Sequence, residues 1–90
     1  MIIKYFADIR TLTGRGEQQW NKAAPTLRAL LGDLVSQYGA AFEKKVFYEG
    51  RLSGAIIILV NGQDAALLKG LDTPLAAEDH VVFFPMVAGG

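Results

Sequence analysis

Residues 55–62 read Ala-Ile-Ile-Ile-Leu-Val-Asn-Gly, and this stretch predicts the centre of the fold. The run 55–60 is unbroken, apolar and rich in β-branched side chains, which is the pattern of a strand covered on both faces. Asn61-Gly62 follows directly, and such a pair is the strongest short signal for a tight β-turn. We therefore expect a buried strand, a short return strand within residues 63–69 and a loop over residues 70–78.

Downstream of that loop the sequence predicts one more strand. Residues His80–Phe84 form it, and Pro85 ends it because proline has no N–H with which to continue a ladder. We expect this strand to pair with residues 56–60 near the centre of a sheet.

Upstream, residues 26–39 carry the clearest helical pattern in the chain. Apolar side chains recur there at helical spacing and form one stripe, which consists of Leu27, Leu30, Leu31, Leu34, Val35 and Tyr38. Thr26 is suited to cap the first turn, and Gly39 to end the last turn in left-handed backbone. The pattern predicts a helix that lays its apolar stripe on the sheet.

Two other regions give weaker signals. At the N-terminus we expect a strand in residues 2–6, a long connection over Ala7–Gly16 and an antiparallel return strand in Glu17–Trp20. After the helix we expect a short helical turn in residues 41–45 and an extended piece in residues 46–48.

The order of these elements is strand, strand, helix and then two or three strands, with no βα repeat. It predicts an α+β fold of the β-grasp type, in which a mixed sheet of four to five strands carries one main helix on one face. Residues 1–85 would form this single domain, and residues 86–90 would extend from it as a tail.

Composition excludes several kinds of function. Nine Lys and Arg balance nine Asp and Glu, which argues against a nucleic-acid-binding surface and against a polybasic membrane patch. The absence of Cys and the single His exclude disulfides, a Cys nucleophile and the usual zinc sites. No apolar run approaches the roughly 20 residues of a membrane span, and the first residues show no signal-peptide pattern. We expect a cytoplasmic domain with no bound metal or cofactor.

The last residues, Pro85-Met86-Val87-Ala88-Gly89-Gly90, are the feature best suited to chemistry. The five residues after Pro85 can project about 16–18 Å from the sheet. Two terminal glycines have no side chains and few backbone limits, so the tip could thread a narrow channel into another protein. Joined to AMP there, the Gly90 carboxylate would become an activated acyl group. A sulfur nucleophile could then replace AMP and leave a thiocarboxylate.

Several segments together resemble the ubiquitin-like sulfur carriers, and specifically the small subunits of molybdopterin synthase. The matching residues are Phe6–Arg10 with Gly14, Thr26–Gly39, Ile58–Gly62, Gly70–Leu75, Val81–Pro85 and Val87–Gly90. The chain departs from the family pattern at Met86, where a second proline is usual. It also has Ala77-Glu78-Asp79 where the family usually has Asp-Gly-Asp.

The resemblance implies a carrier without an active site of its own. An adenylating enzyme would activate Gly90 with ATP and Mg²⁺, and a sulfur donor would then form the thiocarboxylate. The loaded carrier would dock on the large subunit of molybdopterin synthase and deliver sulfur to a cyclic pterin precursor. In that reading Gly89 gives passage for the tail, and Val87 and Ala88 line the channel entrance.

The stretch before the tail is a candidate docking surface, made of Phe84, Pro85 and Met86. Strand alternation places Val81 and Phe83 on one face of the sheet and Val82 and Phe84 on the other. If the helix covers one face, one of these pairs remains exposed, and exposed apolar patches often mark interfaces.

Three alternatives remain open from the sequence. The first is the sulfur carrier for the thiamine thiazole, although such carriers usually lack a middle segment like Ala40–Gly54. The second is a protein modifier joined through Gly90 to lysines of its targets. The third is a β-grasp interaction module with an inert tail.

Overall fold

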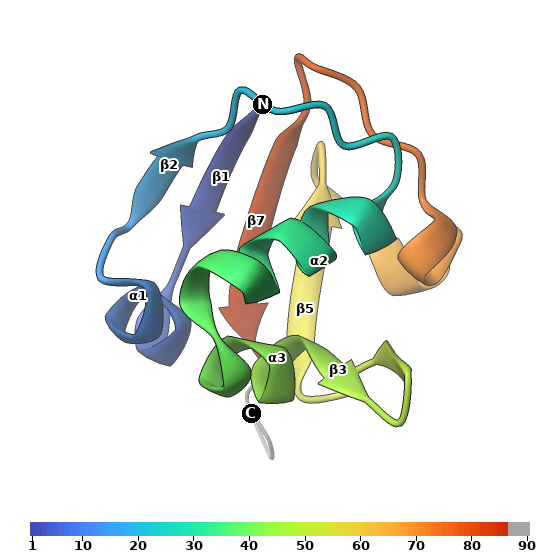
Figure 1. The fold of residues 1–90 in the computed structure, drawn as a ribbon. Helices are drawn as coiled ribbons and strands as arrows, with labels where there is room; N and C mark the ends of the chain where they lie inside the picture. Colours follow the sequence, from blue (N-terminus) through green and yellow to red (C-terminus); the bar gives the residue numbers. More distant parts are fainter. Residues whose placement is uncertain (87–90) are drawn as a thin grey trace.

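The computed structural model describes residues 1–86 and contains a five-stranded sheet with helices packed against it (Figure 1). In chain order the elements are β1 (Ile2–Tyr5), α1 (Ala7–Thr13), β2 (Glu17–Gln19), α2 (Leu27–Tyr38), α3 (Ala40–Val46), β3 (Phe47–Tyr48), β4 (Arg51–Leu52), β5 (Ile56–Val60), β6 (Gln63–Asp64), the 3₁₀ turns η1 (Ala65–Leu67) and η2 (Gly70–Asp72), and β7 (His80–Pro85). Within residues 1–86, no helix is long and apolar enough to cross a membrane.

The last strand lies in the middle of the sheet, whose order is β2-β1-β7-β5-β6. β7 runs parallel to β1, with Tyr5 beside Phe83, and antiparallel to β5, with Ile57 opposite Phe84. The predicted central pairing of the two apolar strands is therefore confirmed. The predicted mixed sheet of the β-grasp fold is confirmed as well.

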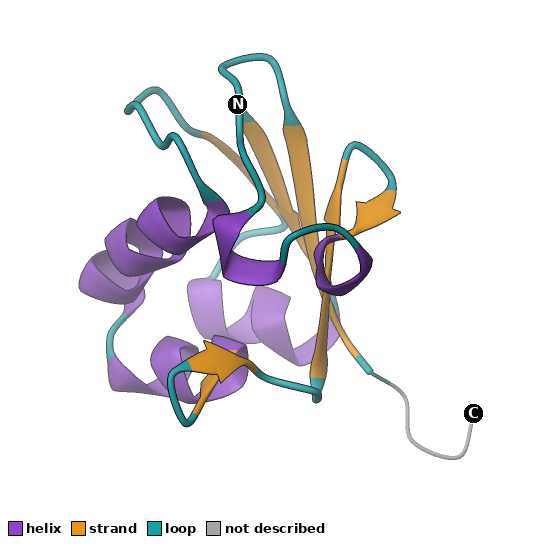
Figure 2. Ribbon diagram, turned by 90° about the vertical axis from the view of Figure 1, so that its right-hand side faces the viewer, coloured by secondary structure: helices purple, strands orange, loops and turns teal. Residues whose placement is uncertain are grey.

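Helices α2 and α3 lie together on one side of the sheet (Figure 2). Thr26 caps α2 by accepting a hydrogen bond from the Ala29 N–H at 3.2 Å, and Gly39 ends it with φ at 87°. Four leucines of the predicted stripe are buried, and they pack into one core with the side chains that β1, β5 and β7 turn toward them. The helix predicted from the sequence therefore forms the cover of the sheet.

The prediction that β5 is covered on both faces is wrong. Ile56, Ile58 and Val60 are buried, whereas Ile57 and Leu59 between them are only half-buried. An unbroken apolar run cannot reveal this difference, because the same residue types suit a helix-covered face and a face that awaits a partner.

The connection predicted over Ala7–Gly16 contains a helix instead. α1 begins at Ala7, which has a positive φ of 53°, and it is capped by Gly14, whose φ is 77°. The Ile9 side chain of α1 is fully buried in the core, which explains why this segment packs against the rest of the fold.

The turn at Asn61-Gly62 forms as predicted, but the return strand is short. Both turn residues have positive φ, 52° and 83°, as a tight hairpin turn requires. β6 then pairs only with Leu59 and Val60, and the chain bends into η1, which begins where Asp64 accepts the Ala66 N–H at 2.9 Å.

Candidate docking face and carboxyl-terminal tail

The described chain ends at Met86, so four of the predicted site residues, Val87, Ala88, Gly89 and Gly90, lie outside the described residues. Their predicted roles stay predictions. The structure does describe Phe84, Pro85 and Met86, which form the base of the tail.

The base of the tail belongs to the centre of the sheet. Pro85 is the last residue of β7 and pairs with Ile56 of β5. Proline has no N–H to donate, but the next residue restores the ladder, because the Met86 N–H donates to the Ala55 oxygen at 2.9 Å. The tail is therefore attached to a strand with neighbours on both sides, which makes its starting point rigid.

One face of the sheet is apolar and carries no helix beside the tail base. Its half-buried side chains come from the three central strands and lie in register, Phe84 opposite Ile57 and Val82 opposite Leu59, with Ile2 further along. We call this surface the open face, defined by Ile2, Ile57, Leu59, Val82 and Phe84. The predicted alternation along β7 is confirmed, since Val81 and Phe83 are fully buried on the other side.

Two large apolar side chains extend the open face at its tail end. Met86 is 51% exposed and Phe6 is 49% exposed. Phe6 lies close to the base of the tail because its N–H donates to the Phe83 oxygen at 3.0 Å. The docking surface predicted from the sequence did not include Phe6. Alternation from Ile2 through Lys4 would have assigned it to the open face.

Charged side chains lie next to the open face and near the base of the tail. Lys4 is exposed on β1, where it lies beside Val82 of the open face. At the end of β1, Asp8 of α1 accepts a hydrogen bond from Lys45 of α3, and this bond lowers the pKa of the Asp8 carboxyl. The ion pair joins the two short helices near the base of the tail.

Three other polar residues, His80, Asp79 and Asp72, make structural contacts. The His80 backbone N–H donates to Asn61 Oδ1 at 3.0 Å, and Asp79 accepts from Asn61 Nδ2 at 2.9 Å, so both fix the β5–β6 turn. Asp72 forms an ion pair with Arg28 at 3.2 Å. Asp72 and Asp79 therefore serve two separate structural contacts.

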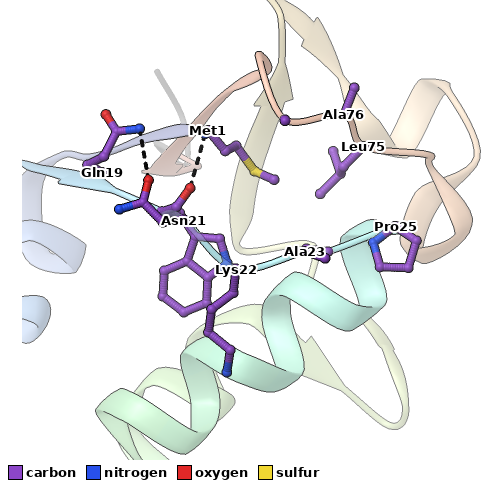
Figure 3. Close-up of a pocket in the computed structure, with 11 residues that line it drawn as sticks. Met1, Gln19, Asn21, Lys22, Ala23, Pro25, Leu75 and Ala76 are labelled. Carbon is purple, nitrogen blue, oxygen red and sulfur yellow. Dashed lines mark hydrogen bonds between the residues drawn. The ribbon is translucent and has the colours of Figure 1, made fainter.

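A hollow of about 650 Å³ lies beside the start of β1, at the end of the sheet opposite the tail base (Figure 3). Its lining is mostly small and apolar, with Ala23, Pro25 and Leu75 among the side chains, and Lys22 is the only charged side chain among the described residues that line it. The Met1 amino group donates to the Trp20 oxygen at 3.1 Å and closes one wall. Such a lining offers no nucleophile paired with a base, so the open face remains the stronger candidate.

Within residues 1–86, no three His, Cys, Asp or Glu side chains lie close enough together to hold a metal ion. The site therefore consists of an apolar surface and the strand end from which the tail leaves.

Comparison with known proteins gives a family match over nearly the whole chain. The model of the ThiS family matches residues 3–90. Sulfur carrier protein CysO of Mycobacterium tuberculosis is 33% identical over 84 residues, which cover 91% of this chain and 89% of that protein.

Two solved structures are similar as well. Small archaeal modifier protein 1 of Haloferax volcanii has a TM-score of 0.78 and 31% identity, with 97% of each chain covered. A Pyrococcus furiosus protein assigned provisionally as molybdopterin converting factor, subunit 1, has a TM-score of 0.75 and 30% identity, with 96% of this chain and 95% of that chain covered.

Proposed function

The chain belongs to the ThiS family of ubiquitin-like sulfur carriers, and from this premise we propose that it carries sulfur as a thiocarboxylate on Gly90. The observation that supports this proposal most is the position of the tail base. The described chain ends at Met86, directly after the central strand β7 and beside the open face, so one partner could hold the face and receive the residues that follow.

The proposed chemistry requires two steps in a partner enzyme. A Gly90 carboxylate oxygen attacks the α-phosphorus of Mg²⁺-bound ATP, which forms an acyl adenylate and releases pyrophosphate. Hydrosulfide or its equivalent from a sulfur donor then attacks the acyl carbon, and AMP leaves with the electron pair of the broken C–O bond. No redox change occurs when the donor is hydrosulfide. The absence of side chains at Gly89 and Gly90 leaves both steps unobstructed.

The open face supplies the docking surface for this chemistry. Phe84, Phe6 and Met86 would be buried against the adenylating enzyme, and burial of such side chains supplies binding energy in proportion to the apolar area covered. Because the tail starts from a fixed strand end, docking the face also directs the tail into the partner.

We propose further that the loaded carrier serves molybdopterin synthesis as the small subunit of molybdopterin synthase. The motifs of the last strand and tail support this assignment, as does the similarity to the Pyrococcus furiosus protein. In this role the large synthase subunit would bind the same open face after the adenylating enzyme has left.

A second candidate function is protein modification, favoured by the similarity to small archaeal modifier protein 1. The same acyl adenylate would then react with lysine amines of target proteins instead of hydrosulfide. The two functions share the activation step and differ in the acceptor.

Intact-mass measurement tests the proposal. We expect incubation with the cognate adenylating enzyme, Mg-ATP and sulfide to raise the mass by the difference between sulfur and oxygen. A chain that lacks Gly89 and Gly90 should keep its fold and gain no mass. If the full-length chain is adenylated and gains no sulfur, the carrier function is wrong.

The acceptor is tested separately with the loaded chain. Addition of the large synthase subunit and the cyclic pterin precursor should return the chain to its original mass and yield molybdopterin. If the pterin receives no sulfur and Gly90 instead becomes joined to lysines of other proteins, the modifier function is supported.

A further inference from the structure

Two hollows adjoin each other beyond the outer side of β5. The first has a volume of about 160 Å³ and is lined by Met86, Ile57 and Asp64 among others. The second has a volume of about 350 Å³ and is lined by Arg28 and Arg51 among others. Leu52 and Ala66 line both, so a continuous surface leads from the base of the tail to the two arginines. We call it the arginine edge, defined by Met86, Leu52, Ala66, Arg28 and Arg51.

The far end of the arginine edge has an unbalanced positive charge. Asp72 is the carboxylate of the second hollow, and it pairs with Arg28 Nη2 at 3.2 Å. Arg51 is exposed and has no carboxylate within 4.0 Å among residues 1–86. Asp64 lies in the first hollow, where it accepts the Ala66 N–H. The surface is therefore acidic near the tail and basic at its far end.

The elements that hold the two arginines are well fixed. Arg28 lies in the first turn of α2, just after the Thr26 cap. Arg51 lies on β4, whose neighbour Leu52 pairs with Phe47 of β3 and packs against the core. The hairpin turns at Glu49 and Gly50, both with positive φ, and β4 then lies against η2. Two guanidinium groups on fixed backbone suit a carboxylate, which arginine binds through two parallel hydrogen bonds.

We propose that an acidic, extended segment of the adenylating enzyme binds along the arginine edge, with a carboxylate on Arg51 and an apolar side chain against Leu52 and Ala66. The inference rests on the proposed function, because it concerns the enzyme that takes the tail. That enzyme must approach Met86, and Met86 lines the hollow that continues to the arginines. Charge complementarity at the far end then sets the orientation of the carrier on the enzyme.

Three variants test the inference through the rate of pyrophosphate release by the cognate adenylating enzyme with Mg-ATP. Arg51→Gln should raise the KM for the carrier about threefold to fivefold at low salt, with kcat unchanged, because a contact at the rim is lost. Lys22→Gln removes the same charge from an exposed position near the opposite end and should leave KM unchanged. Asp72→Asn should lower KM, because it removes from the hollow a negative charge that offsets the arginines and repels an acidic partner segment.

The outcomes separate the inference from the function on which it rests. If the wild-type chain supports no ATP-dependent reaction, the proposed function is wrong, and the inference is wrong with it. If the wild-type chain reacts and Arg51→Gln has the same KM as Lys22→Gln, only the inference is wrong. A higher KM for Asp72→Asn would also contradict it. Unfolding curves of all variants should coincide with that of the wild type, because these side chains are exposed.

Discussion

Phe83 and Phe84 are neighbours in the chain but belong to two different surfaces. Phe83 is fully buried under the helices, with its ring 5.6 Å from that of Tyr5 and 5.9 Å from that of Phe42. Phe84 is half-buried on the open face, opposite Ile57. The comparison shows how one strand serves two tasks, since its covered side supports the fold and its open side is left for a partner.

The largest expected effect comes from Phe83→Ala. The substitution removes a ring from the closed core and should lower the free energy of unfolding by about 3–5 kcal/mol. Phe84→Ala, as the matched control, should cost about 1–2 kcal/mol, because its side chain is only partly buried and lies on a face that no helix covers. Denaturant titration followed by fluorescence of Trp20, the single tryptophan, measures both. Equal losses would contradict the division between the faces.

The same comparison can be made on β5. Ile58→Ala should lower the free energy of unfolding by about 2–4 kcal/mol, and Ile57→Ala by about half as much. Ile58 is buried under the helices, whereas Ile57 lies on the open face. Thermal unfolding of the two variants gives the ranking, and the reverse order would show that the open face contributes more to folding than burial suggests.

A network of polar side chains stabilises the helix-covered side of the sheet. Gln18 Oε1 accepts hydrogen bonds from the hydroxyls of Tyr5 and Tyr38, each at 2.7 Å. Gln18→Ala should cost about 1–3 kcal/mol, because it leaves both hydroxyls without their acceptor. Tyr38→Phe should cost less, since it removes donor and bond together. Equal stability of Gln18→Ala and wild type in denaturant titration would show that water replaces the lost acceptor.

The smallest effects are expected from pH. Burial raises the pKa of the Tyr5 hydroxyl, so its contribution is present below the unfolded value of about 10 and is lost as pH rises above it. The Lys45 hydrogen bond lowers the pKa of Asp8, so that contribution is present above the unfolded value and is lost as pH falls through the folded one.

Stability measured across pH distinguishes these two sites. Tyr5→Phe should be less sensitive to alkaline pH than the wild type, and Asp8→Asn less sensitive to acid. The Asp8 effect should be the smaller, because the carboxylate is half exposed and water screens the pair. Identical curves for Tyr5→Phe and wild type above the tyrosine range would contradict the first assignment.

Elements with a strong local pattern could be predicted from the sequence. The stripe of α2 has the period of a helix, and its buried side follows directly from that period, whereas the unbroken run of β5 predicted the strand but not which of its faces is covered. α1 could not be predicted, because it is short, starts from a left-handed Ala7 and has no side-chain cap.

The candidate site likewise has one part that could be predicted from the sequence and one part that could not. Phe84, Pro85 and Met86 are adjacent in the sequence, so strand alternation and the position of Pro85 were enough to find them. The arginine edge depends on Arg28 and Arg51, which lie 23 residues apart in the numbering and come together only through the hairpin. No local pattern predicts such a pair.

The most direct test of the central claim is the loading of Phe84→Ala by the cognate adenylating enzyme with Mg-ATP and sulfide. If the open face docks the carrier and the helix-covered face only supports the fold, the variant should remain folded while its KM for loading rises about tenfold or more, as expected for loss of a central aromatic contact. Loading with wild-type KM by a fully folded Phe84→Ala would contradict the claim that the open face positions the tail.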